Sequence, residues 1–262
     1  MKSLALVVEA DPAVLNIAIV RKAVHVCLSD TSTSVREAAV DLIGRFILHN
    51  ADLTLNYYPL LCERINDVGV SVRKRVLKIF RDICLEQPDF PKIADLCKQM
   101  ITRIGDEESI KKLVSEAFQH MWFQNIDTQK EPHRLIRRVT SIVDVVAACR
   151  EIGYEWFHQL LETLMKKSDE NVQITTFDTS KQIVDGLMEH MVRCEEVDAE
   201  SRATTSSSSA LVSTLQALEI FCKSAPQLLV PHVQLLHPYL NIKCSVSNCS
   251  PLLFAIYYLH SV

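Results

Sequence analysis

Residues Asp67 to Leu85, D-V-G-V-S-V-R-K-R-V-L-K-I-F-R-D-I-C-L, repeat a pattern that the chain has already used once. Residues Asp30 to Leu48 read D-T-S-T-S-V-R-E-A-A-V-D-L-I-G-R-F-I-L, with Asp, Ser, Val and Arg at the same offsets. A weaker third copy begins at Asp106 and carries Lys111 in place of the arginine. Repetition at a period of about 37 to 39 residues, with two helical patterns in each unit, is typical of an α-solenoid.

The second helix of each copy carries an apolar stripe with the i, i+4, i+7, i+8, i+11 spacing of a core-facing surface. A helical hairpin cannot bury such a stripe alone, so it must stack on its neighbours. The sequence therefore predicts an all-α fold, an α-solenoid of HEAT-type helical hairpin repeats. The stripe positions are Val35, Ala39, Leu42, Ile43 and Phe46; Val72, Val76, Ile79, Phe80 and Ile83; and Ile110, Val114, Ala117, Phe118 and Met121.

Helix boundaries are predicted from turn chemistry. Asp11-Pro12 is expected to start a helix that continues to about Leu28, because Asp caps a helix and Pro suits its first turn. Ser34 and Ser71 stand just before the apolar stripes, where a hydroxyl can cap the second helix of each repeat. After the repeats, periodicity alone predicts helices over about 135–149, 154–165, 177–193, 210–223 and 227–240.

The pattern divides the chain into six stretches. Three similar HEAT repeats occupy 1–123, and a polar connector follows over 124–132. Further helical hairpins are expected over 133–194. The stretch 195–209 is acidic and rich in Ser and Thr, and we expect it to form a loop because it has too little apolar surface to repay ordering. A helical hairpin over 210–249 and a divergent C-terminal tail over 250–262 complete the chain.

Composition limits the function classes. The chain is 48% hydrophobic with only five glycines, which favours helices joined by short turns over a β-rich fold. Its net charge of −4 gives no overall affinity for polyanions, so a nucleic-acid contact would need a local basic patch. The nine cysteines stand singly and mostly in apolar helical patterns, as expected for buried thiols in a reducing compartment. We find no apolar run of about 20 residues and no secretory signal pattern, and we therefore predict a cytosolic or nuclear protein.

Arg36 and Arg73 stand beside their apolar stripes, and each can reach an Asp-bearing turn of its own or the adjacent repeat. We predict a structural ladder between repeats made of Asp30, Arg36, Asp67 and Arg73. Direct contact between these arginines and phosphate is the alternative.

A basic row lies on the second repeat. Lys74, Lys78 and Arg81 have i, i+4, i+7 spacing opposite the apolar stripe, and Arg75 lies at their edge. The corresponding positions of the first repeat are acidic or glycine, so the repeat itself does not require these charges. The row is a candidate contact for DNA phosphates or for an acidic partner, and a merely solvated face is the alternative.

A weaker basic cluster opens the hairpin after the connector. Its candidate contacts are Arg134, Arg137 and Arg138, flanked by Lys130 and His133. The same two interpretations apply to it.

Catalytic, cofactor and metal sites are not predicted. His190 and Cys194 lie one helical turn apart, and His232, His237, Cys244 and Cys249 are loosely grouped, but none has the paired spacing of a structural zinc site. The chain has no Gly-x-Ser-x-Gly elbow, no phosphate-binding loop and no His-Glu-x-x-His motif. We therefore predict a protein that is not an enzyme and that binds no cofactor or small-molecule substrate.

The repeat sequences resemble a known family. The runs Thr33 to Phe46 and Val70 to Pro88 look like the HEAT-repeat region of the Nipped-B-like family of cohesin loaders. The segments D-V-V-A-A-C-R (144–150), G-Y-E-W-F (153–157) and H-P-Y-L-N-I-K-C-S (237–245) look like later parts of that region. The resemblance covers about residues 1–249. Because members of the family are several times longer, the resemblance implies that this chain is a fragment.

The resemblance implies a nuclear, chromatin-associated scaffold that loads cohesin onto DNA and stimulates the cohesin ATPase, in sister chromatid cohesion and chromatin looping. The implied partners are the SMC heads and kleisin of cohesin, DNA bound without sequence specificity, and a small loader subunit bound through a region outside this chain. No membrane contact is implied.

Periodicity alone leaves two other classes open. One is a transport or phosphatase-adaptor scaffold that binds only proteins, and the other is the helical scaffold of a large enzyme such as a giant kinase. The uncovered end faces of terminal repeats also predict poor solubility in isolation.

Overall fold

The computed structural model describes residues 2–48, 50–127, 130–166, 170–200 and 205–236. These residues form α-helices and short 3-10 helices, with no strand in the described ranges. The prediction of an all-α solenoid of HEAT-type hairpins is confirmed. The chain divides into two compact units, Met1–Ala117 and Phe118–Val262.

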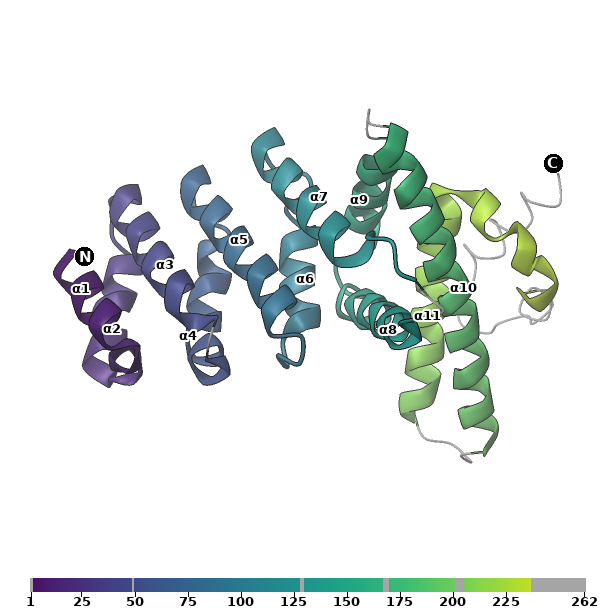
Figure 1. The fold of residues 1–262 in the computed structure, drawn as a ribbon, viewed down its shortest axis with the longest axis horizontal. Coiled ribbons are helices and arrows are strands. Elements are labelled where there is room, and N and C mark those ends of the chain that lie inside the picture. The colour runs from purple at the N-terminus through teal and green to yellow at the C-terminus, as the bar shows by residue number, and fades with distance from the viewer. Residues whose placement is uncertain (1, 49, 128–129, 167–169, 201–204, 237–262) are drawn as a thin grey trace. The chain divides into compact units, whose positions relative to one another are not determined.

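The first unit is built from stacked helical hairpins (Figure 1). The helix α3 packs against α2 and α4, and α5 packs against α4 and α6. Contacts also join α3 to α5 and α2 to α4, so equivalent helices of successive repeats lie side by side. The helices of this unit are α1 (Lys2–Ala10), η1 (Pro12–Asn16), α2 (Ala18–Leu28), α3 (Thr33–Ile47), α4 (Ala51–Arg64), α5 (Val70–Glu86), α6 (Ile93–Ile101) and the larger part of α7 (Glu108–Trp122).

The apolar stripes supply the core of this unit. Most stripe positions are buried, and Val76, Phe80 and Val114 are completely inaccessible to solvent. Val35 and Phe46 are partly exposed, while Ile47 beside Phe46 is buried. Full burial of a side chain of this size stabilises the fold by about 1.5–3 kcal/mol, so the stripes provide most of the driving force for stacking.

Two local boundaries differ from the sequence-based expectation. The predicted helix from Asp11 to Leu28 is broken at Ile17, which has extended backbone angles between η1 and α2. The Tyr57 hydroxyl donates to the Leu15 carbonyl at 3.0 Å and takes the place of a helical amide at that oxygen. This hydrogen bond stabilises the break.

The caps of α3 and α5 also differ. Their N-cap residues are Ser32 and Gly69, so the predicted capping serines at 34 and 71 lie inside the helices. The Ser32 side chain makes no capping hydrogen bond, and Gly69 has no side chain to make one. Instead, Asp30 and Asp67 each accept a hydrogen bond at 2.8 Å from the amide two residues later, which closes the turn before the helix.

The second unit is a helical bundle in which α11 packs against α8, α9 and α10 (Figure 1). Its described core includes Val139, Ile142, Leu187, Leu218 and Phe221. Its remaining helices are α8 (Pro132–Ala148), α9 (Glu155–Met165), α10 (Glu170–Glu200), α11 (Thr205–Ser224), η2 (Pro226–Leu228) and η3 (Val230–His232).

The boundary between the units falls inside α7, earlier than the predicted end of the three-repeat block at residue 123. Aromatic packing explains this position. The ring centroid of Phe118 lies 4.6 Å from that of Trp122, which in turn lies 5.6 Å from that of Phe157 in α9. The end of α7 therefore shares the core of the second unit.

The predicted loop over 195–209 is largely wrong. Residues 195–200 form the end of α10 and residues 205–209 begin α11. The segment E-E-V-D-A-E contains the strong helix formers Glu and Ala, and Ser and Thr suit the start of a helix. Residues 201–204 lie outside the described ranges.

Two other boundaries are corrected. The connector predicted over 124–132 ends at residue 131 in the structure, because Pro132 occupies the first turn of α8. The helix expected from 227 to 240 is replaced by η2 and η3, followed by helical residues 233–236. Pro226 and Pro231 interrupt regular helix there, because proline cannot donate a backbone hydrogen bond. The rest of the predicted hairpin 210–249 and the tail 250–262 lie outside the described residues.

Candidate nucleic-acid interface

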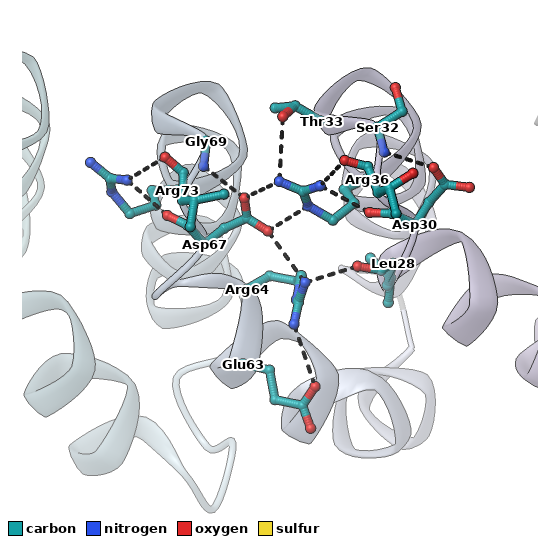
Figure 2. A network of polar contacts seen from close by, with 12 residues as sticks. Leu28, Asp30, Ser32, Thr33, Arg36, Glu63, Arg64, Asp67, Gly69 and Arg73 are labelled. Carbon is teal, nitrogen blue, oxygen red and sulfur yellow. Dashed lines mark hydrogen bonds and ion pairs between the residues drawn. The ribbon is translucent and has the colours of Figure 1, made fainter.

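The two aspartates of the predicted ladder lie in the turns before α3 and α5, and the two arginines lie in the first turn of those helices (Figure 2). The guanidinium of Arg36 in α3 donates to Asp67 from two nitrogens, with Nε–Oδ2 2.7 Å and Nη2–Oδ1 2.6 Å. Its Nη1 donates to the carbonyls of Asp30 at 2.9 Å and Thr31 at 3.0 Å. Arg36 thus connects its own turn to the turn of the next repeat.

The arrangement recurs one repeat later. Arg73 donates through Nη1 to the Asp67 carbonyl at 2.7 Å and through Nη2 to Asp106 Oδ1 at 2.9 Å. The Arg36 and Asp67 side chains are 7% and 2% exposed, and those of Arg73 and Asp106 are 11% and 15% exposed. All three guanidinium nitrogens of Arg36 and both Nη atoms of Arg73 donate inside the protein, and both side chains are largely buried, which leaves them unsuited to direct phosphate contact.

The electrostatics match this geometry. The hydrogen bond to Asp67 raises the pKa of Arg36 despite the opposing effect of burial. Burial acts to raise the pKa of the Asp67 carboxyl, but hydrogen bonds from Arg36 and the Gly69 amide, with the charges of Arg36 and Arg64, lower it overall. Both groups are therefore held in their charged forms.

Sequence reasoning missed the part that Arg64 plays in the network. Arg64, at the end of α4, donates through Nη1 to the Leu28 carbonyl at 3.0 Å and to Asp67 Oδ2 at 3.3 Å (Figure 2). It closes the C-terminal end of α2, where backbone carbonyls lack helical partners. Its position three residues before Asp67 is the signal that could have found it.

In the basic row on α5, two of the four candidate cations form ion pairs with carboxylates and the other two do not. Arg75 is paired with two carboxylates of α3, with Nε 3.1 Å from Glu37 Oε1 and Nη1 bonded to Asp41. Arg81 pairs with its neighbour Asp82, with Nη2 2.6 Å from Oδ1. Lys78 is exposed and Lys74 partly exposed, and neither makes an ion pair within the described part of the chain. Two of the four candidate cations are thus unneutralised.

The weaker basic cluster contains both exposed and buried arginines. Arg134 is exposed and pairs with Glu131 at 2.7 Å, and Arg137 is exposed. Arg138 is only 7% exposed and donates through Nη2 to the Gln124 carbonyl at 2.8 Å. Desolvation, with a smaller effect from Arg134, lowers its pKa to about 10. The expectation that Arg138 contacts a ligand at the surface is therefore wrong, because Arg138 lies among the buried residues of α8, beside Val139 and Ile142.

Some of the histidine and cysteine residues that were considered for metal binding lie within the described ranges. His190 Nδ1 lies 3.0 Å from Thr214 Oγ1 and 3.6 Å from Cys194 Sγ, and His232 pairs with Asp185 at 2.7 Å. No three His, Cys, Asp or Glu side chains gather as a metal site among the described residues. His237, Cys244 and Cys249 lie outside them. In the same ranges, no helix is both long and apolar enough to cross a membrane.

Comparison with known proteins gives consistent matches. A family model for a HEAT repeat associated with sister chromatid cohesion matches residues 2–43. Nipped-B-like protein from Homo sapiens is 47% identical over 248 residues, which cover 95% of this chain and 9% of that protein. Nipped-B protein from Drosophila melanogaster is 39% identical over 98% of this chain and 13% of its own length. The chain thus spans about a tenth of these relatives.

A solved structure has the same fold. The C-terminal fragment of the cohesin loader SCC2 from Chaetomium thermophilum superposes with a TM-score of 0.78 over 98% of this chain and 18% of that one, at 24% sequence identity. At that identity the match is evidence for the helical-repeat architecture alone.

Proposed function

Because this chain belongs to the Nipped-B-like family of cohesin loaders, as a fragment of its HEAT-repeat region, we propose that it acts within a nuclear, chromatin-associated scaffold that loads cohesin onto DNA. The names of its relatives support a role in sister chromatid cohesion. Its stacked helical hairpins support a binding role, since solenoids present long surfaces to their partners.

The proposal that this chain contacts DNA rests on the pair Lys74 and Lys78 on α5. The two side chains are accessible, one helical turn apart, and not neutralised within the described structure. Lysines in this arrangement can neutralise successive phosphates of a duplex, which adds affinity and salt dependence without reading sequence. The partner proposed for this surface is double-stranded DNA.

The proposal also includes stimulation of the cohesin ATPase and a role in chromatin looping. ATP hydrolysis would take place in the SMC heads of cohesin, and this scaffold would stimulate it by holding cohesin and DNA together. The SMC heads and kleisin are the proposed protein partners, and the small loader subunit would bind elsewhere in the longer polypeptide. The chain is proposed to have no enzymatic activity of its own.

The test is binding of the full chain to a duplex of arbitrary sequence across a salt series. We compare the parent with Lys74→Gln/Lys78→Gln and with a control of equal charge change, Lys22→Gln/Lys166→Gln, at exposed sites on α2 and at the end of α9. The slope of log affinity against log salt changes by about 0.9 for each phosphate contact. Loss of the two lysines on α5 is therefore expected to flatten the slope by about two contacts, while the control retains the parental slope.

Two results would contradict the proposal. Equal slopes for the parent and the α5 variant would mean that this surface does not touch DNA. Absence of binding by all three proteins would favour the alternative of a protein-protein scaffold of the transport or phosphatase-adaptor type. In that case, capture of purified cohesin by the parent and its loss in the α5 variant would identify α5 as a protein-docking surface.

A further inference from the structure

Arg75 belongs to the basic row by sequence, but its guanidinium is engaged by the preceding repeat. It bonds to Glu37 and Asp41, which lie one helical turn apart on α3. The side chains are 45%, 30% and 28% exposed for Arg75, Glu37 and Asp41, so the group lies at the protein surface and a large ligand can reach it.

The ion pairs continue away from α5. Asp41 Oδ2 also accepts from Arg45 Nη2 at 2.6 Å, and Arg45 Nη1 lies 3.2 Å from Glu9 Oε1 in α1. The chain of contacts thus runs through three carboxylates and two guanidiniums across α1, α3 and α5. Its formal charge is negative although it contains two arginines.

The two sides of α5 therefore differ. On the side of α3, a phosphate approaching Arg75 would meet Glu37 and Asp41, and the repulsion would offset the attraction of the guanidinium. On the side of α7, Lys78 and Arg81 border a small recess with Leu113 and Ala117, and these two residues carry no charge. A polyanion thus meets two carboxylates at the α3 edge of α5, and none among the residues that line the recess on the other side.

We propose that Glu37 and Asp41 restrain Arg75 and set the edge of the DNA-contacting surface, so that phosphates bind at Lys74 and Lys78 and are excluded from α3. This inference rests on the proposed function and adds to it a pair of residues that limit affinity and define the footprint. Exposed ion pairs contribute little to stability. Removing the two carboxylate charges should therefore cost little stability, and Arg75 can then take a phosphate as its partner.

The test removes the carboxylate charges while keeping similar side-chain shapes, in Glu37→Gln/Asp41→Asn of the full chain. Released Arg75 is expected to add one phosphate contact, which steepens the salt slope by about 0.9. At low salt this variant should bind the duplex several-fold more tightly than the parent. Adding Arg75→Gln to this variant should return the slope to the parental value.

A control separates Arg75 from the general effect of lost negative charge. Asp52→Asn/Glu151→Gln removes the same charge at exposed positions in α4 and after α8. It is expected to raise affinity less than the α3 variant and to leave the salt slope unchanged. Thermal unfolding of each protein shows whether it is folded, and Glu37→Gln alone serves if the double variant is not.

The outcomes distinguish this inference from the proposed function. If the parent binds DNA through Lys74 and Lys78 but the α3 variant has the parental slope, the restraint on Arg75 is excluded and the proposed function stands. If neither protein binds DNA, both ideas are excluded. If the slope stays steep after Arg75→Gln is added, a different cation accounts for the gain and the inference is wrong.

Discussion

The Arg36 guanidinium binds both carboxylate oxygens of Asp67, across the boundary between two helical repeats, at 2.7 and 2.6 Å. The pair is almost fully buried, and Arg36 also binds two carbonyls of its own turn. A buried charge without its partner is costly, so each of these residues requires the other. The relationship links the stacking of repeats to an ionic interaction, and it leads to the first two predictions.

Arg36→Ala is expected to lower the free energy of unfolding by about 3 kcal/mol, because it leaves the Asp67 charge buried with weaker partners. Chemical denaturation of the parent and the variant measures the change. Arg45→Ala is the matched control, since its side chain is 55% exposed and its ion pairs should contribute no more than about 1 kcal/mol. Equal losses in the two variants would show that burial of the Arg36 pair has no special effect.

Stability should fall in acid partly through Asp67. Its pKa is lower in the folded state than its ordinary value, so the folded protein holds the proton less tightly than the unfolded chain. The stabilisation is complete above the ordinary carboxyl pKa of about 4 and disappears as the pH falls through the lower folded value. Unfolding free energies measured from pH 6 to pH 2 should therefore decline less steeply in Asp67→Asn than in the parent. Parallel curves would exclude this assignment.

Gly44→Ala is expected to destabilise the first unit although alanine favours helix. A Cβ at residue 44 would lie 2.6 and 2.7 Å from Cδ1 and Cγ1 of Ile79 in α5. The gain in helix propensity is about 1 kcal/mol, and crowding in a packed interface costs about 1–3 kcal/mol. Thermal unfolding should show a lower Tm for Gly44→Ala and recovery of part of the loss when Ile79→Val is added. A higher Tm for the single variant would mean that Ile79 moves aside at little cost.

Arg138→Met is expected to leave DNA binding unchanged and to have little effect on stability. The guanidinium is buried, its Nη1 has no hydrogen-bond partner in the described structure, and desolvation lowers its pKa to about 10. Replacing a poorly compensated buried charge with an apolar chain of similar length is often neutral or stabilising. The salt-dependent duplex assay and thermal unfolding measure both effects. A flatter salt slope would restore Arg138 as a surface contact.

The fold was largely predictable because its signals are local and repeated. The stripes through Val72 and Phe80 follow helical periodicity, and the repeat of Asp30 and Arg36 at Asp67 and Arg73 sets the stacking unit. The predicted helix boundaries were wrong where contacts with distant residues override the local preference of the backbone. One example is the break at Ile17, where a hydroxyl 42 positions along the chain from Leu15 takes up its carbonyl.

The candidate interface was predictable only as a set of charges. Sequence spacing places Lys74, Arg75, Lys78 and Arg81 on one surface of a helix, because helical geometry fixes which side chains share a face. Spacing does not reveal that Glu37 and Asp41 of another repeat engage Arg75. Nor does it reveal that Arg138 turns inward to the Gln124 carbonyl.

The sequence by itself determined the all-helical repeat, the apolar stripes and the positions of the ladder residues, because these follow from the period of the helix and the chemistry of turns. Only the tertiary structure decided which cations are neutralised and which are exposed. The physical reason is that ion pairing depends on distances of a few ångströms between side chains from different repeats. The difference between Arg75, held by two carboxylates, and Lys78, exposed without an ion pair in the described residues, arises only when α3 and α5 pack together.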